Sequence, residues 1–120
     1  MNNWVLLEHK VYSANSIDIH YDFLVENGID CLTWKFLKLP SLNQSSIDIF
    51  KQPNHRLVWL SRIEHELSGN RGFVKRIDHG IFINVSDNLD SEYCRFILDG
   101  ELLNGLFEIS GNSCRLSNNN

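Results

Sequence analysis

The sequence predicts an all-β, mainly antiparallel protein that forms a small closed or nearly closed β-barrel with at most one short helix. Three observations support this fold class. Short segments are rich in β-branched and aromatic residues and alternate polar with apolar side chains, turn residues divide them at close intervals, and hardly any stretch has a helical period. Many short strands divided by such turns are typical of antiparallel barrels and sandwiches.

The first three strands are predicted at residues 4–9, 18–26 and 30–37. Between the second and third, Asn27-Gly28 is a strong signal for a two-residue hairpin turn. With the turn at these two residues, Asp22 lies opposite Thr33 and His20 lies opposite Lys35. The hairpin therefore places a lysine on the same face as a histidine.

The remainder of the chain is also predicted to be mainly strands. After Pro40, residues 41–51 are the only stretch in which a short helix fits. Further strands are predicted at residues 56–64, 72–78, 80–85, 92–98 and 106–109, with turns between them that include His79-Gly80. We expect one domain over residues 1–116 and a frayed tail at 117–120.

Composition limits the classes of function. The net charge of −4 argues against a general coat for nucleic acid, because such binding depends on neutralising phosphates. Between residues 35 and 76, however, eight basic residues face three acidic ones, which gives a local charge of +5. A solvated surface explains such a bias, and so does a face that receives an anion such as phosphate.

Targeting signals and cysteines suggest where the protein works. The N-terminus lacks the basic start and apolar core of a signal peptide, and no apolar stretch approaches 18 residues. Cys31, Cys94 and Cys114 form an odd set without close pairing, which favours buried reduced thiols. We therefore expect a cytoplasmic protein, and a monomer.

His20 and Asp22 are the most informative pair in the sequence. Residues two apart on a strand share a face, so an imidazole and a carboxylate lie side by side, with Asp18 further along the same face as a fallback ligand. This arrangement suits a metal such as Mn²⁺, Zn²⁺ or Fe²⁺, or acid–base chemistry. It also suits a hydrogen-bonded pair with only a structural role.

Six segments in order resemble a known family: LLEH (6–9), HYDFLVENG (20–28), TWKFLKLPS (33–41), NHRLVWLSRIE (54–64), SGNRGFVKRIDHG (68–80) and RFILDGELLNGLFEI (95–109). Together they resemble the 3′-phosphoesterase module of bacterial DNA-repair ligases of the ligase D type, and its small stand-alone relatives. The resemblance implies a β-barrel that uses a divalent metal, typically Mn²⁺, with Zn²⁺ as a second choice. It implies removal of a phosphate or a terminal ribonucleotide from the 3′ end of DNA, and a separate ligase or polymerase as a partner.

The resemblance also assigns roles to individual residues. It implies that His9, His20 and Asp22 are the metal ligands and that His55 binds phosphate or protonates the leaving oxygen. Two departures from the family pattern affect these roles. Ten residues separate His9 from His20, against about five in the ligase-linked members, so we expect the intervening loop to bulge.

The second departure is Leu24, which occupies the place of an arginine that engages phosphate in the ligase-linked members. Loss of one such contact costs ~2–4 kcal/mol of transition-state stabilisation. Arg71, in a turn with glycines on both sides, is a candidate for the missing phosphate contact, and Lys38 and Lys35 are weaker candidates.

Two other functions fit the same residues. The first is a catalytically degenerate module that recognises DNA ends or a repair partner, which the substitution at Leu24 favours. The second is a non-haem iron oxygenase, in which His65 or His79 completes a site of two histidines and one carboxylate and Arg76 holds a carboxylate substrate.

Overall fold

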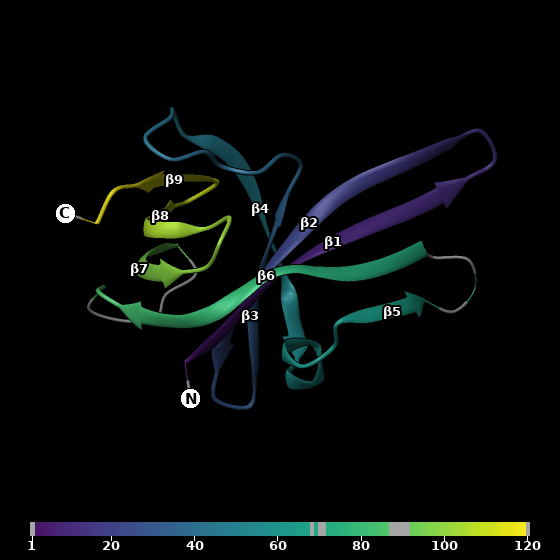
Figure 1. Cartoon of the computed structure of the whole chain (residues 1–120), viewed down its shortest axis with the longest axis horizontal. Coiled ribbons are helices and arrows are strands. Elements are labelled where there is room, and N and C mark those ends of the chain that lie inside the picture. Colours follow the sequence, from purple (N-terminus) through teal and green to yellow (C-terminus); the bar gives the residue numbers. More distant parts are fainter. Residues whose placement is uncertain (1, 68, 70–71, 87–91, 120) are drawn as a thin grey trace.

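The computed structural model describes residues 2–67, 69, 72–86 and 92–119. It confirms the predicted all-β class, since these residues form nine antiparallel strands and one four-residue 3₁₀ helix (Figure 1). The elements are β1 (Asn3–Ser13), β2 (Ser16–Asn27), β3 (Asp30–Phe36), β4 (Ile47–Arg56), η1 (Leu57–Leu60), β5 (Glu64–Leu67), β6 (Gly72–Asn84), β7 (Tyr93–Asp99), β8 (Asn104–Ser110) and β9 (Ser113–Ser117).

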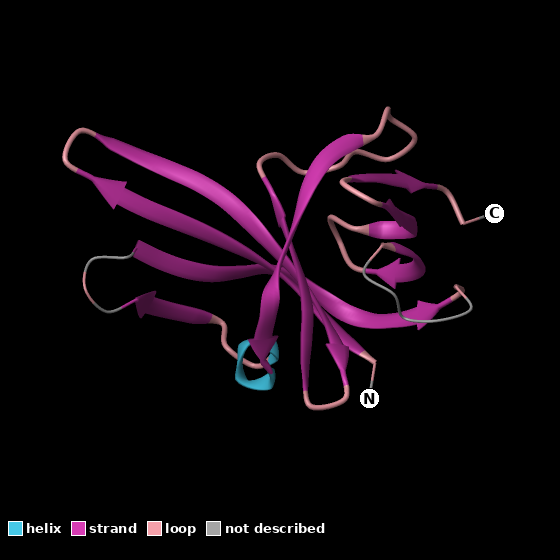
Figure 2. Ribbon diagram, turned by 180° about the vertical axis from the view of Figure 1, so that it is seen from behind, coloured by secondary structure: helices cyan, strands magenta, loops and turns pink. Residues whose placement is uncertain are grey.

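Eight of the strands pair in a ring, so the sheet is nearly closed. The order is β1-β2-β3-β4-β9-β8-β7-β6, and β1 also pairs with β6 to complete the ring. β5 pairs with β6 outside the ring (Figure 2). The narrowest junction joins β4 to β9 through Ile47↔Cys114 and Asp48↔Ser113. In Figure 1 the β1–β2 and β5–β6 hairpins project from the same end of the molecule, away from β7–β9.

The main core fills the inside of the ring with aromatic side chains. Phe23 is its centre, with ring centroids 5.0 Å from Phe107, 5.9 Å from Phe36 and 5.9 Å from Trp4. All four side chains are fully buried. Burial of such large side chains is the main stabilising contribution to a domain of this size.

A second, smaller cluster lies on the outer face of the sheet. It comprises Val5, Leu7, Leu24, Cys31 and Val74. Side chains from η1 and β5 cover it, namely Trp59, Leu60 and Leu67. The first three strands are therefore buried on both faces over part of their length, and we call this second group the outer cluster.

The structure corrects the predictions for residues 41–64. No helix forms in 41–51, and β4 occupies Ile47–Arg56 instead. The strand predicted at 56–64 is replaced largely by η1 at Leu57–Leu60. Trp59 and Leu60 pack against the outer cluster, and burial of these side chains favours a tight turn over an extended strand.

The predicted turn at His79-Gly80 is also wrong, because β6 runs without a break from Gly72 to Asn84. Gly80 lies directly opposite Trp4, and a Cβ atom at this position would collide with the carboxylate of Asp99 and crowd the indole of Trp4. The glycine is needed for close packing within a strand rather than for a turn.

The last strand, β9, lies beyond the strands predicted from the sequence and takes up the first residue of the expected tail. β9 includes Ser117, and the backbone N–H of Asn118 donates a hydrogen bond of 3.2 Å to Oδ1 of Asn43. Within the described part of the chain, no helix has the length and apolar character needed to span a bilayer.

Candidate metal centre

The β1–β2 hairpin places His9 directly opposite His20. The prediction of a bulged loop between them is wrong. The ten intervening residues form four further cross-strand pairs, from Lys10↔Ile19 to Ser13↔Ser16, and a turn at Ala14-Asn15. The pairing has no register shift, so the additional residues lengthen the hairpin without moving the two histidines apart.

His9, His20 and Asp22 form a compact group of possible metal ligands. One ligand atom from each lies within 4.8 Å of the others. Nδ1 of His9 is 3.2 Å from Nε2 of His20, which is 3.5 Å from Oδ2 of Asp22. The side chains of His20 and Asp22 are only 18% and 12% exposed.

The donor atoms fit a metal ion in both type and spacing. Two atoms that each lie ~2.1 Å from one tetrahedral ion are about 3.4 Å apart, close to the two short distances in this group. Two imidazole nitrogens and one carboxylate oxygen suit Zn²⁺, Fe²⁺ or Mn²⁺. The group could therefore hold a divalent ion and leave coordination positions open for other ligands.

The β2–β3 hairpin places Lys35, rather than Thr33, opposite Asp22. The predicted register is wrong by two residues because the loop comprises Gly28 and Ile29, with Gly28 at a φ of 73°. Directly opposed residues share a face, so Lys35 lies on the same side of the sheet as the ligand group. His20 lies beyond the last β2–β3 pair, Tyr21↔Phe36.

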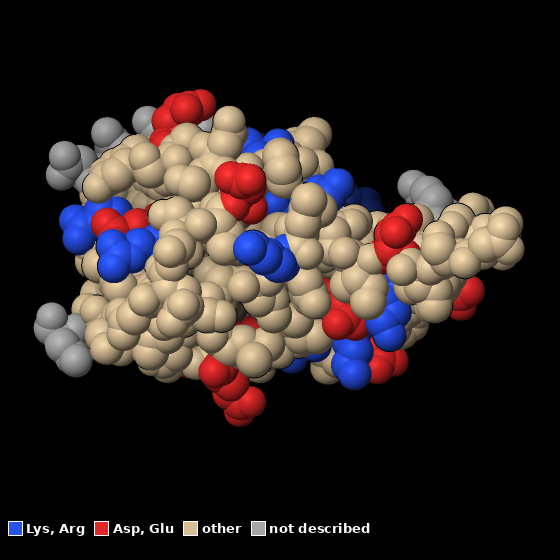
Figure 3. All heavy atoms as spheres, turned by 90° about the horizontal axis from the view of Figure 1, so that it is seen from above, with Lys and Arg blue, Asp and Glu red and all other residues tan. Residues whose placement is uncertain are grey.

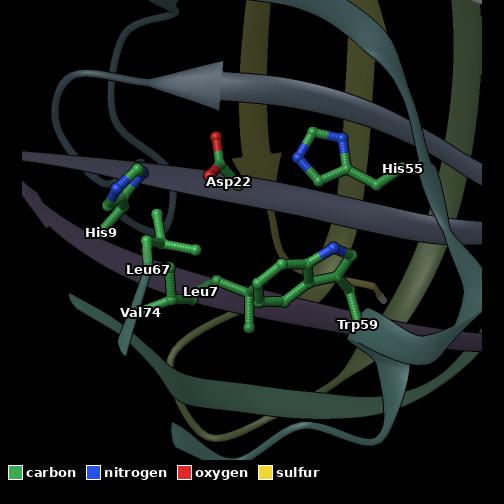
Figure 4. Close-up of a pocket in the computed structure, with 7 residues that line it drawn as sticks. All are labelled: Leu7, His9, Asp22, His55, Trp59, Leu67 and Val74. Carbon is green, nitrogen blue, oxygen red and sulfur yellow. The ribbon is translucent and has the colours of Figure 1, made fainter. Parts of the chain in front are cut away.

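A β-bulge in β4 brings His55 to the same face. Gln52 pairs with Thr33 and His55 pairs with Cys31, so Pro53 and Asn54 together oppose a single residue of β3. The extra residue reverses the alternation of side chains and turns His55 to the outer face. There it lines the same pocket as His9 and Asp22 (Figure 4).

The pocket beside the ligand group is small and largely apolar. Its volume is about 70 Å³, and Leu7, His9, Asp22, His55, Trp59, Leu67 and Val74 line it. In Figure 4 the polar side chains follow one side of the pocket and the apolar ones follow the other. None of the described residues that line it is a lysine or an arginine.

Trp59 is held in place from two sides. The guanidinium carbon of Arg62 lies 4.4 Å from the centroid of its ring, and the His65 ring meets it edge-on at 5.4 Å. Trp59 is partly buried against the outer cluster and also lines the pocket. Sequence reasoning did not identify Trp59 as a pocket residue, because its position depends on η1, where a strand was predicted instead.

The other candidate residues lie elsewhere. Lys38 is exposed and lines a separate pocket with Phe50, and Arg71 lies outside the described residues. Asp18 is exposed opposite Val11 and is not part of the ligand group. Leu24 is fully buried in the outer cluster, so its position faces protein rather than substrate.

The residues required by the oxygenase interpretation are not assembled around the ligand group. His65 packs against Trp59. His79 and Arg76 line a different pocket, which has a volume of about 440 Å³. Among the described residues, His9 rather than His65 or His79 completes the group with His20 and Asp22.

The cysteines are free and buried, as expected. Burial, followed by the charges of Glu26 and Asp30, raises the pKa of the Cys31 thiol to about 11. Burial raises the pKa of Cys114 to about 12. Although Cys31 pairs with His55, it remains a neutral thiol near pH 7 and does not supply a thiolate ligand.

Charged side chains are mixed on the face shown in Figure 3, where lysines and arginines lie among aspartates and glutamates. The local excess of positive charge in the sequence therefore does not form one continuous basic patch on this face. No protein-family model matches the chain, and a search of curated proteins found no match.

Proposed function

We propose that this protein is a divalent-metal-dependent phosphoesterase that acts on 3′ ends of nucleic acid in DNA repair. The observation that supports the proposal most is the convergence of His9, His20 and Asp22 beside a pocket that also contains His55. These are the four residues to which the family resemblance assigns metal binding and leaving-group chemistry.

His9, His20 and Asp22 would hold the ion, with Mn²⁺ as the preferred metal and Zn²⁺ as the alternative. A bound divalent ion supplies a Lewis acid for a phosphoryl oxygen and lowers the pKa of a coordinated water. The low exposure of His20 and Asp22 limits competition from bulk water, which strengthens their interaction with a cation.

His55 is positioned for proton transfer. Its Nδ1 lies 3.1 Å from the carbonyl oxygen of Pro53, and because a carbonyl can only accept, Nδ1 donates this hydrogen bond. Nε2 then remains available to accept a proton, or to donate one to a leaving oxygen when the ring is protonated. The β-bulge at Pro53 thus both aims the ring and selects its tautomer.

Among the basic residues that the structure describes, Lys35 is the candidate best placed to neutralise a phosphate. It lies opposite Asp22 on the ligand face, whereas Lys38 lines another pocket. A lysine contributes a point charge rather than the bidentate contact of an arginine. We therefore expect turnover slower than in a site that has an arginine at the position of Leu24.

The test is incubation of the purified protein with Mn²⁺ and a primer-template that ends in a 3′-phosphate. We expect release of inorganic phosphate that Asp22→Ala abolishes and that the exposed, remote variant His79→Ala retains. No release, or equal release by Asp22→Ala, contradicts the proposal.

A second candidate is a non-catalytic module that binds DNA ends or a repair partner. Burial of Leu24 supports it, because no phosphate-binding side chain can act from that position. Salt-dependent binding to DNA ends without turnover would favour this candidate over the phosphoesterase.

A further inference from the structure

The ligand group lies at a boundary between two chemically different surfaces. On the β3 side, Lys35 faces Asp22 directly across the strand pair. On the β1 and β6 side, the same carboxylate, together with His9 and His55, lines a pocket whose other lining residues are Leu7, Trp59, Leu67 and Val74. We call it the apolar pocket. In Figure 4 these apolar groups lie together along one side, across from Asp22 and His55.

The apolar pocket does not suit a phosphate group. On the side formed by Leu7, Trp59, Leu67 and Val74, a phosphate dianion would meet no charged side chain, and its transfer there from water would cost it much of its solvation free energy. None of the described residues that line the pocket is a lysine or an arginine. By contrast, transfer of apolar carbon from water into such a site is favourable.

The size of the apolar pocket limits what it can hold. Its volume of about 70 Å³ is roughly half that of the engineered ~150 Å³ cavity that binds benzene. About three carbon atoms therefore fit, whereas a complete nucleobase does not.

We infer that the substrate is a phosphate ester whose alcohol part inserts about three carbons into the apolar pocket, while its phosphate lies over Asp22 towards Lys35. The position of the phosphate rests on the proposed function; the apolar character of the alcohol part rests on the pocket alone. In a 3′-phosphorylated DNA end, the alcohol part is the terminal deoxyribose, whose ring carbons provide such a surface, and the base remains outside.

The test measures equilibrium binding with probes that cannot turn over. Ethyl-, propyl-, butyl- and hexylphosphonate carry a P–C bond in place of the ester and are titrated calorimetrically into the Mn²⁺-loaded protein. We expect Kd to fall by about two- to fourfold for each added methylene up to butyl, since complete burial of a CH₂ is worth a factor of about four. Hexylphosphonate gains nothing further, because its last carbons remain in solvent.

Variants identify the surface that is responsible. Leu67→Ser removes the dependence of Kd on chain length. Ile83→Ser, a matched control whose side chain is 58% exposed elsewhere on β6, retains it. Lys35→Met weakens all four probes by the same factor. Circular dichroism of each variant shows whether the fold is intact.

Several outcomes overturn the inference: no binding by any probe, equal Kd values across the series, a continued gain at hexyl, or a chain-length dependence that Leu67→Ser leaves unchanged. These outcomes are distinct from failure of the proposed function. A flat series together with phosphate release from DNA contradicts only the assignment of the apolar pocket. A graded series without phosphate release contradicts only the phosphoesterase proposal.

Discussion

Nδ1 of His9 lies 3.2 Å from Nε2 of His20, across a regular antiparallel pair in which the two residues are directly opposed. The strand register brings the two side chains opposite each other. This opposition is insensitive to the length of the hairpin beyond Lys10 and Ile19, because backbone hydrogen bonds rather than a loop maintain it.

Replacing a residue of the ligand group should weaken metal binding. His9→Ala, His20→Ala and Asp22→Asn each remove one donor atom or its charge, and we expect Mn²⁺ affinity to fall at least about tenfold, equal to ~1.4 kcal/mol. Isothermal titration calorimetry measures this. His65→Ala is the control, because His65 packs on Trp59 outside the group; equal losses in this variant would show that the effect is not specific.

Shortening the β1–β2 hairpin in register should preserve metal binding. Removal of Tyr12, Ser13, Ser16 and Ile17 deletes two opposed pairs and keeps the Ala14-Asn15 turn, so His9 still faces His20. Removal of Tyr12 and Ser13 alone shifts the register by two residues and separates the histidines. Comparison of Mn²⁺ affinity in the two deletions checks this, and equal affinities would contradict the role of the register.

Asp78 should be one of the largest single contributors to stability. Its side chain is 5% exposed, and its carboxylate accepts hydrogen bonds from the backbone N–H groups of His79, Glu101, Leu102 and Leu103 at 2.8–3.0 Å. Asp78→Ala leaves these donors without their acceptor, and we expect a loss of ~2–4 kcal/mol in the free energy of unfolding.

Urea denaturation measures the effect of Asp78→Ala. Lys75→Ala is the matched control, since Lys75 lies on the same strand and is exposed. A loss below 1 kcal/mol, on the order of a typical surface substitution, would show that water replaces the carboxylate.

Stability should fall as the pH rises above 9. The thiols of Cys31 and Cys114 have pKa values raised from 9.0 to about 11 and about 12, and burial is the main cause. Above pH 9 the unfolded chain therefore releases these protons while the folded chain retains them, so the unfolded state binds fewer protons and gains stability relative to the folded state.

Urea midpoints at pH 8 and pH 10.5 test this dependence. In a Cys31→Ala/Cys114→Ala variant the decline should be smaller than in the unchanged protein. An equal decline in both would assign the effect to other groups.

The strands that carry the ligand group could be predicted, because the alternation of polar and apolar residues around His20 and Asp22 can be read from the local sequence without knowledge of tertiary contacts. The β2–β3 register was missed because Gly28 can be the second residue of an Asn27-Gly28 turn or the first residue of a Gly28-Ile29 turn. The first turn places Leu24 opposite Cys31 and the second places it opposite Thr33, and packing rather than the turn sequence decides between them. The apolar pocket was missed for a related reason. Leu67 and Val74 reach Leu7 only through pairing of β5 and β6 with β1, which no short segment encodes.

The two-pair junction between β4 and β9 has a consequence for how the molecule fluctuates. A ring of strands opens most readily where the fewest cross-strand pairs must break, and here that place is Ile47↔Cys114 and Asp48↔Ser113. All of β3 stands between this junction and β2. The ring can thus separate at its weakest join while the β1–β2 hairpin, which carries His9, His20 and Asp22, keeps all of its own cross-strand pairs.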